Sequence, residues 1–171
     1  GGLLLLDWET MEVVANVGSA NFYSDEIQGQ VNITTSKRSP GSTLKPFIYA
    51  LALEQGLIHY STMLKDTPQA FNEYAPDNYG STFKGPVKAW YALADSRNIP
   101  AVSLAQQISN PDLYDFLQQA KISDLKNKEH YGLSIVLGSA EVSMLELAKL
   151  YAMLGNNGIY KNINFYKESF A

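Results

Sequence analysis

The residues best suited to chemistry in this chain are a hydroxyl and an amine three positions apart, Ser42 and Lys45. They follow a proline-glycine break and open an apolar run, residues 46–54, that predicts a buried helix. Pro46 has no N–H to donate, so it belongs in the first turn of that helix and places Ser42 at the helix N-terminus. Residues three apart share a helix face, so we expect the Lys45 amine to lie beside the Ser42 hydroxyl.

This placement would make Ser42 a nucleophile. A helix N-terminus presents unpaired N–H groups and the positive end of the helix dipole, which favour a deprotonating serine and the oxyanion of a tetrahedral intermediate. The same positive end and burial lower the pKa of Lys45, so that a neutral amine can take the serine proton without a histidine. The alternative, in which Ser42 is an ordinary N-cap residue, is equally compatible with the pattern.

The serine-lysine spacing alone is weakly selective, because Ser81 with Lys84 and Ser123 with Lys126 share it. A Gly-Pro pair follows Lys84 and blocks a helix there, whereas Ser123 lies in a polar stretch and is interpreted as a helix cap. Only Ser42 opens a long apolar helix.

Ser96 and Asn98 form the second candidate group, in a polar break between two apolar segments. On a tight turn both side chains can point into one cleft. There the hydroxyl can relay a proton between Lys45 and a leaving group, and the amide can hold the lysine or a peptide-like substrate. The simpler interpretation, which the pattern alone favours, is that both residues cap helix ends.

The composition is that of a soluble globular protein and excludes several functional classes. The chain has 171 residues, of which 46% are hydrophobic and 18% charged, and its net charge of −4 argues against nucleic acid as a partner. It has no cysteine, which excludes disulfides, a thiolate nucleophile and sulfur-ligated metals. His59 and His130 are isolated, so we predict no metal and no cofactor. The apolar run of residues 3–6 is too short to span a membrane.

Periodicity and chain breakers predict the elements that must position these residues. The fold class predicted is α+β, a mostly helical domain with an amino-terminal β-hairpin. Ser143 and Glu146 form a capping box that predicts the start of a helix ending near Gly155. The remaining predictions are a hairpin of residues 3–8 and 11–17, a loop over 20–38, a connector and loop over 57–85, helices over 86–93, 101–107 and 112–117, a buried irregular segment over 132–138, and a short strand over 159–165.

The two candidate groups together resemble the transpeptidase domain of class A penicillin-binding proteins, within the serine β-lactamase and D,D-peptidase superfamily. The resemblance covers nearly the whole chain, and the segment around Ser42 is its most specific part. The segments that carry it are Val17-Gly18-Ser19, Arg38 to Phe47, Gly85-Pro86-Val87, Ser96 to Val102, Tyr131 to Ser134, Leu137 to Val142 and Leu145 to Gly158.

The resemblance implies a fold, a reaction and a location. Ser42 would be the acylated nucleophile, Lys45 its general base, Ser96 a further catalytic residue and Asn98 a substrate-binding residue. Ser42 would attack the D-Ala-D-Ala end of a peptidoglycan stem peptide, and an amine of a neighbouring stem would resolve the acyl-enzyme; a β-lactam antibiotic would acylate Ser42 as a substrate mimic. The implied location is periplasmic or otherwise extracytoplasmic, with the parent protein anchored to the inner membrane.

One departure from the family pattern is that this sequence contains no Lys-Thr-Gly or Lys-Ser-Gly motif. In the family that motif lies on a strand that supplies the second oxyanion N–H, and losing one such donor costs on the order of a hundredfold in rate. We therefore expect residues 1–171 to be the amino-terminal part of a transpeptidase domain, without independent transpeptidase activity. We expect the missing carboxy-terminal segment to be supplied by another chain, to be swapped from another copy, or to have been removed in cloning.

Three alternatives to a transpeptidase remain open from the sequence. A penicillin-binding sensor or scaffold on the same fold would acylate without turnover. A β-lactamase ranks lower, because the chain has no Glu-x-x-Leu-Asn segment to activate a deacylating water. A helical interaction module would use every serine as a cap. The enzymatic interpretation requires a Ser42 hydroxyl within reach of the Lys45 amine and not turned to open solvent.

Overall fold

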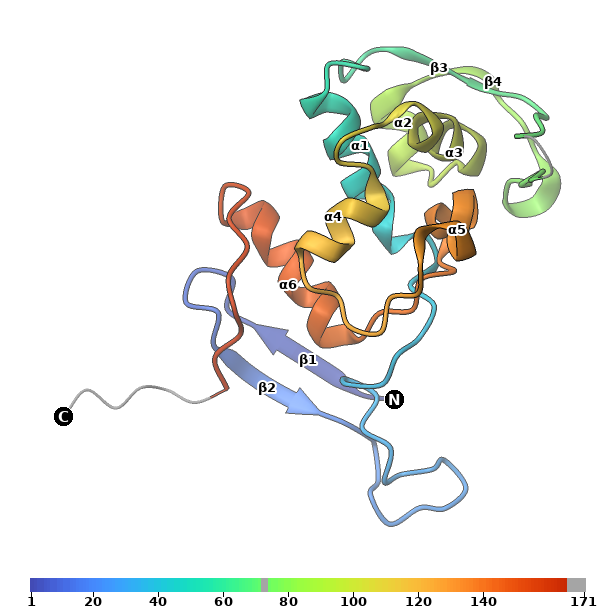
Figure 1. The fold of residues 1–171 in the computed structure, drawn as a ribbon. Helices are drawn as coiled ribbons and strands as arrows, with labels where there is room; N and C mark the ends of the chain where they lie inside the picture. The colour runs from blue at the N-terminus through green and yellow to red at the C-terminus, as the bar shows by residue number, and fades with distance from the viewer. Residues whose placement is uncertain (72–73, 166–171) are drawn as a thin grey trace. The chain divides into compact units, whose positions relative to one another are not determined.

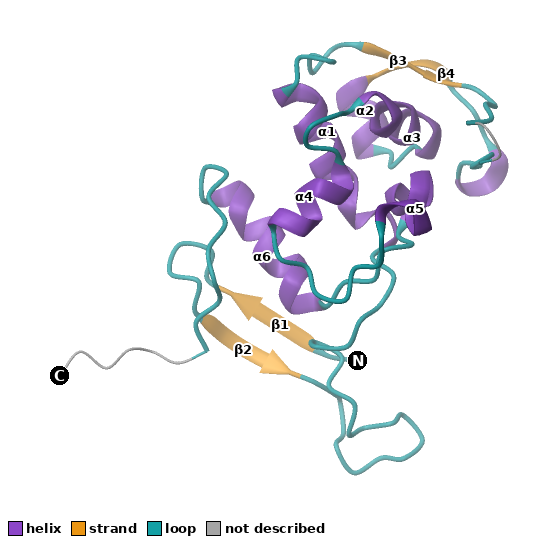
Figure 2. Cartoon of the chain, viewed as in Figure 1, coloured by secondary structure: helices purple, strands orange, loops and turns teal. Residues whose placement is uncertain are grey.

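The computed structural model describes residues 1–71 and 74–165, which divide into two compact units (Figures 1 and 2). Unit 1 contains residues 1–38 and the described residues from 141 onward. Unit 2 contains residues 39–140 and carries all four candidate site residues.

Unit 1 is built on the predicted hairpin. Strands β1 (Leu3–Leu6) and β2 (Val13–Val17) pair antiparallel, with Leu3 opposite Val17. Helix α6 (Met144–Gly155) packs against β1. The predicted capping box at its start is confirmed, since the Ser143 hydroxyl accepts from the Glu146 N–H and the Glu146 carboxylate accepts from the Ser143 N–H.

The predicted loop of residues 20–38 is also confirmed, and backbone hydrogen bonds between Arg38 and Val142 fasten its end. The predicted strand over residues 159–165 is wrong, because the structure shows only an isolated bridge between Asn164 and Glu12. Asparagine is depleted in strands, and Asn162 and Asn164 interrupt the apolar run there.

Helix α1 is the centre of unit 2 and confirms the predicted buried helix. A 3₁₀-helix, η1 (Gly41–Leu44), leads directly into α1 (Lys45–Glu54), so the regular α-helix begins one turn later than the first residues of the motif. Gly56 ends α1 at a φ of 69°, where it donates to Leu53 and the next N–H donates to Ala52. This is a Schellman motif, in which glycine adopts the left-handed conformation at little cost.

Strands β3 (Met63–Asp66) and β4 (Gly85–Lys88) pair antiparallel and pack against α2 (Ala89–Ala94). The sequence did not predict this pairing, and the prediction that Pro86 begins a helix is wrong. Pro86 lies in β4, which is an edge strand of a two-stranded sheet, and an edge strand tolerates a residue without an N–H.

The remaining helices of unit 2 enclose one core. Helix α3 begins earlier than predicted, because Pro100 occupies its third position, where an N–H has no partner in the helix. Asn127, and not Ser123, caps α5, so the prediction for Ser123 is wrong. The elements are η2 (Tyr79–Ser81), α3 (Asn98–Gln107), α4 (Leu113–Gln119), α5 (Lys128–Tyr131) and η3 (Gly132–Leu137). Helix α1 contacts α2, α3 and α4, and η1 contacts η3.

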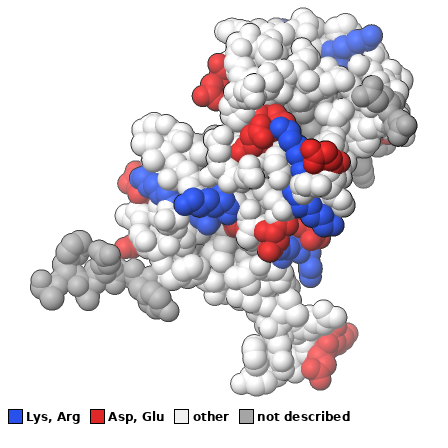
Figure 3. Space-filling view, viewed as in Figure 1, with Lys and Arg blue, Asp and Glu red and all other residues white. Residues whose placement is uncertain are grey.

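Charged side chains of both signs are visible on one face of the molecule (Figure 3). On the face shown in Figure 3, acidic and basic side chains are interspersed. Among the described residues, no helix combines the length and the apolar character needed to cross a lipid bilayer.

Candidate active site

Ser96 occupies a special backbone position at the end of α2. It lies at the C′ position of a Schellman motif, where its N–H donates to Leu93 at 3.0 Å and the Arg97 N–H donates to Ala92 at 2.9 Å. Its φ of 52° is left-handed, a conformation that favours glycine. A non-glycine residue there costs on the order of 1 kcal/mol, so the serine is retained at this position against a local preference.

Asn98 is the first residue of α3, and three hydrogen bonds fix it. Its N–H donates to Asn78 Oδ1 at 2.8 Å, its Nδ2 donates to the Asp77 carbonyl at 2.6 Å, and its Oδ1 accepts from Lys45 Nζ at 2.6 Å. The N-cap of α3 is Arg97. Asn98 is therefore not a helix cap, whereas Ser96 caps the end of α2 through its backbone N–H and uses its side chain for Lys45. The interpretation that both residues merely cap helix ends is wrong for Asn98 and incomplete for Ser96.

Lys45 joins these residues to α1. Its side chain is 1% exposed, and its Nζ donates to Ser96 O at 2.5 Å, to Ser96 Oγ at 3.1 Å and to Asn98 Oδ1 at 2.6 Å. An ammonium has three N–H donors, so the three acceptors occupy all of them. The structure thus brings together Lys45, Ser96 and Asn98, although 51 and 53 positions separate the last two from the lysine.

The surroundings of Lys45 favour its neutral form. Burial, and secondarily the positive charge of Arg97, lower the pKa of Lys45 to about 8. About one amine in ten is then neutral at pH 7, compared with fewer than about one in a thousand for an ordinary lysine. A neutral amine has a lone pair, to which the Ser96 hydroxyl can donate across the same 3.1 Å. This contact is the geometry that a proton relay requires.

Ser42 lies in η1 as an exposed residue, and its hydroxyl makes no hydrogen bond to any described residue. Pro40 is the N-cap of η1 and Leu44 that of α1, so Ser42 is not the N-cap residue of the alternative interpretation. The exposed position leaves Ser42 accessible to a substrate, but it does not meet the expectation that the hydroxyl is turned away from open solvent. The expected hydrogen bond between Ser42 and Lys45 is not formed among the described residues, because the Lys45 amine is bonded to Ser96 and Asn98 instead.

The turn before Ser42 is held by a residue that sequence reasoning missed. The Ser39 hydroxyl donates to the Gly138 carbonyl at 2.7 Å, and the Gly41 N–H donates to the Ser39 hydroxyl at 3.3 Å. Gly138, at a φ of 97°, approaches so closely that a Cβ atom there would lie 2.4 Å from the Gly41 nitrogen. In the sequence, the only indication of this close contact was the pair of glycines, Gly132 and Gly138, at the two ends of residues 132–138.

A buried polar group next to the site was also missed. Asp66, Asn78 and Arg97 are 0%, 4% and 6% exposed; Asn78 and Arg97 both donate to Asp66, and Asn78 also accepts from the Asn98 N–H. The two charged residues that end β3 are a weak signal, since strand ends often carry charges.

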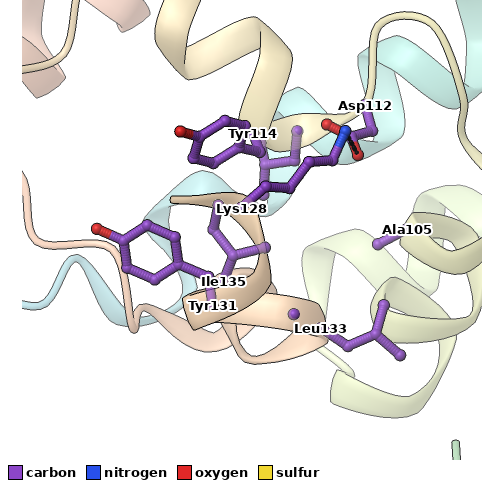
Figure 4. A pocket seen from close by; sticks show the side chains of 9 residues that line it. Ala105, Asp112, Tyr114, Lys128, Tyr131, Leu133 and Ile135 are labelled. Carbon is purple, nitrogen blue, oxygen red and sulfur yellow. Dashed lines mark ion pairs between the residues drawn. The ribbon is translucent and has the colours of Figure 1, made fainter. Parts of the chain in front are cut away.

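A separate pocket of about 200 Å³ lies in the same unit and contains none of the four candidate residues (Figure 4). Lys128, which lines it, forms an ion pair with Asp112 at 2.6 Å, shown in Figure 4, and its charge lies over the Tyr114 ring. In the described part of the chain, no three His, Cys, Asp or Glu side chains are grouped to hold a metal ion. The other lining residues are Ala105, Leu113, Tyr131, Gly132, Leu133 and Ile135.

Several known proteins that this chain resembles carry the name penicillin-binding protein. Residues 1–170 match the model of the penicillin binding protein transpeptidase domain. Penicillin-binding protein 1C of Escherichia coli is 35% identical over 157 residues, which are 91% of this chain and 20% of that protein. Penicillin-binding protein 1A/1B of Bacillus subtilis is 31% identical over 171 residues, 98% of this chain and 18% of that protein.

Solved structures share the fold. The crystal structure of penicillin-binding protein 1A from Haemophilus influenzae superposes with a TM-score of 0.82 at 29% identity, covering 95% of this chain and 24% of that one. The PonA1 protein of Mycobacterium tuberculosis, in complex with penicillin V, gives a TM-score of 0.79 at 23% identity, covering 96% of this chain and 45% of that one. The chain spans about a fifth of the length of the curated relatives that it matches. With the family model matched from the first residue to the penultimate one, the chain belongs to the penicillin-binding protein transpeptidase family.

Proposed function

We propose that this chain carries the nucleophile and the general base of a serine D,D-transpeptidase of peptidoglycan synthesis. The observation that carries the proposal is the buried amine of Lys45, which is hydrogen-bonded to Ser96 and Asn98, has a pKa lowered to about 8, and lies one turn from Ser42. Family membership supports the reaction class.

In the first half-reaction, Ser42 Oγ attacks the carbonyl carbon of the penultimate D-Ala of a stem peptide. The proton of the hydroxyl moves to neutral Lys45, and the oxyanion forms. The peptide C–N bond then breaks, and the proton passes from Lys45 through the Ser96 hydroxyl to the nitrogen of the departing D-Ala. Ser42 is left as an ester of the stem peptide.

In the second half-reaction, an amine of a neighbouring stem peptide attacks the ester carbonyl. The amine gives up a proton to Lys45, the C–O bond to Ser42 breaks, and Ser42 takes the proton back. The product is a new amide bond, which cross-links the two stems.

Asn98 has a role on both sides of this cycle. Its Oδ1 holds Lys45, while its Nδ2 donates to the Asp77 carbonyl. We propose that a peptide substrate takes the place of the Asp77 carbonyl as the acceptor for Nδ2. An amide with an extended backbone offers a carbonyl of the same kind, so Asn98 Nδ2 keeps an acceptor, while the Asp77 carbonyl, whose bond is exposed, turns to water.

Penicillin is proposed as a substrate mimic. The PonA1 neighbour is a complex with penicillin V, and the curated relatives are named penicillin-binding proteins. Attack of Ser42 on the β-lactam carbonyl would break the ring C–N bond and give the ring nitrogen the proton. Because the peptidoglycan substrate lies outside the cytoplasmic membrane, we propose an extracytoplasmic location, which the absence of cysteine from the sequence fits.

The test is covalent labelling of the full-length protein in which this sequence occurs, with fluorescent penicillin, followed by mass spectrometry of the peptides. We expect one adduct, on Ser42, and none in the Ser42→Ala variant. An adduct that persists for hours supports a transpeptidase or a sensor, which release of D-Ala from a stem-peptide substrate then separates. Loss of the adduct within minutes would indicate a β-lactamase, and labelling that survives Ser42→Ala would refute the assignment of the nucleophile.

A further inference from the structure

The turn formed by Ser96, Arg97 and Asn98 is anchored through its middle residue. Ser96 and Asn98 contact Lys45, whereas the Arg97 side chain is engaged elsewhere. Its Nε donates to Asp66 Oδ2 at 2.8 Å, and its Nη2 donates to the carbonyl of Thr82. Asp66 ends strand β3, so a buried ion pair ties the turn to the β3–β4 hairpin.

Asn78 links the same carboxylate to the turn by a second route. Its Nδ2 donates to Asp66 Oδ1 at 2.7 Å and to Thr82 O at 3.0 Å, and its Oδ1 accepts from the Asn98 N–H at 2.8 Å. The side chain is 4% exposed, so water does not compete for these bonds. One amide therefore connects Asp66 with the first residue of α3.

The direction of each hydrogen bond follows from Asp66. A carboxylate only accepts, and this one receives Asn78 Nδ2, Arg97 Nε and the Lys84 N–H at 3.1 Å. Asn78 must therefore turn its nitrogen toward Asp66 and its oxygen toward Asn98. In the Asn98 side chain, Nδ2 donates to the Asp77 carbonyl, so Oδ1 faces Lys45 Nζ and accepts from it. Both ends of the path from Asp66 to Lys45 are thus fixed.

We propose that Asp66 and Asn78 are positioning residues, which act through Arg97 and the Asn98 backbone to hold Ser96 and Asn98 on Lys45. The inference rests on the proposed function of Lys45 as the general base. Ser96 keeps a left-handed backbone against its local preference, and a strained conformation persists only when the surroundings over-determine it. The buried bonds to the neighbouring residues Arg97 and Asn98 supply that constraint.

The test is the rate of Ser42 acylation by fluorescent penicillin in the full-length protein. The variants are Asn78→Ala, Asp66→Asn, Asn78→Asp and the exchange Asp66→Asn/Asn78→Asp. Each single variant either removes a hydrogen-bond partner or places two amides or two carboxylates opposite each other at positions 66 and 78. We expect acylation to be slower by about tenfold or more, because a small misplacement of catalytic groups lowers the rate strongly. The final adduct per protein reports the folded fraction, so that rate and folding are measured separately.

The exchange variant is the decisive arm. An amide at position 66 can donate to a carboxylate at position 78, whose other oxygen still accepts from the Asn98 N–H. The exchange gives up the bond from position 78 to the Thr82 carbonyl, which keeps Arg97 Nη2 as its donor. The net charge is unchanged. We expect the exchange to restore the rate to within about threefold of the parent, which a loss of packing alone would not do. If Asn78→Ala does not fold, the acylation rate of the exchange variant is compared with the rates of Asp66→Asn and Asn78→Asp. That comparison still tests the positioning role.

Asn156→Ala is the matched control. Asn156 is 7% exposed, donates to Trp8 O and Met11 Sδ, and lies in unit 1. We expect it to lower the midpoint of thermal unfolding and leave the acylation rate unchanged.

Two results would overturn the inference: Asn78→Ala acylated as fast as Asn156→Ala, or an exchange variant no faster than the slower single variant. A parent protein that is not acylated at Ser42 would refute the proposed function itself, and not this inference alone.

Discussion

At the scale of single residues, the candidate site contains a buried lysine, Lys45, that has no carboxylate partner among the residues the structure describes. Its amine is surrounded by a carbonyl, a hydroxyl and an amide oxygen, none of which carries a full negative charge. Burial then disfavours the ammonium, and the neighbouring Arg97 adds repulsion. The same three acceptors orient the amine, so they prepare a base without stabilising its protonated form as a carboxylate would.

This environment predicts a pH dependence. Because only the neutral amine can accept the Ser42 proton, the acylation rate constant should rise with pH and level off above the Lys45 pKa of about 8. Below that midpoint the rate should fall about tenfold per pH unit. Stopped-flow measurement with a chromogenic β-lactam between pH 5.5 and 9.5 checks this. Lys45→Ala should lose both the rate and the inflection, and an unchanged rate in that variant would rule out Lys45 as the base.

At the scale of elements, Ser42 lies next to a close backbone contact between the end of η3 and the start of η1. Gly138, which ends η3, approaches the Gly41 backbone more closely than any side chain would allow. The contact is between backbone atoms and cannot be relieved by rotating a side chain. The turn, and Ser42 directly after it, would have to move.

Gly138→Ala is therefore expected to slow the acylation of Ser42 by about tenfold to a hundredfold. Gly56→Ala is the matched control, since Gly56 also has a positive φ but a Cβ there would meet nothing within 4 Å. Both substitutions place a non-glycine residue in a left-handed backbone conformation, which lowers the free energy of unfolding by about 1 kcal/mol. Only Gly138→Ala also displaces the turn. Equal acylation rates in the two variants, measured with fluorescent penicillin, would show that the contact does not position Ser42.

At the scale of the whole molecule, local signals and long-range contacts separate what the sequence could predict from what it could not. The β1–β2 hairpin, α1 and α6 were predicted because their signals lie within a few neighbouring residues: two apolar runs joined by a short polar link, a proline near the start, and a capping box. The β3–β4 pairing was missed because residues 67–84 separate its two strands, so the sequence has no short hairpin turn between them. The grouping of Lys45, Ser96 and Asn98 required the family resemblance, since the spacing alone favoured helix caps. Asp66 and Asn78 could not be found, because their role exists only after the loop and the strand are folded together.

The left-handed backbone of Ser96 implies a conflict between durability and activity. Glycine at this position would give the higher free energy of unfolding, and this chain instead has serine, which lowers it. Ser96→Gly should therefore raise the midpoint of thermal unfolding above that of Ser96→Ala by about 2–4 °C, while both variants lose the hydroxyl and acylate slowly. Calorimetry of the pair checks this, and a glycine variant that melts no higher than the alanine variant would contradict it. If the difference is found, one residue of this chain governs both its resistance to heat and its proposed reaction with penicillin, in opposite directions.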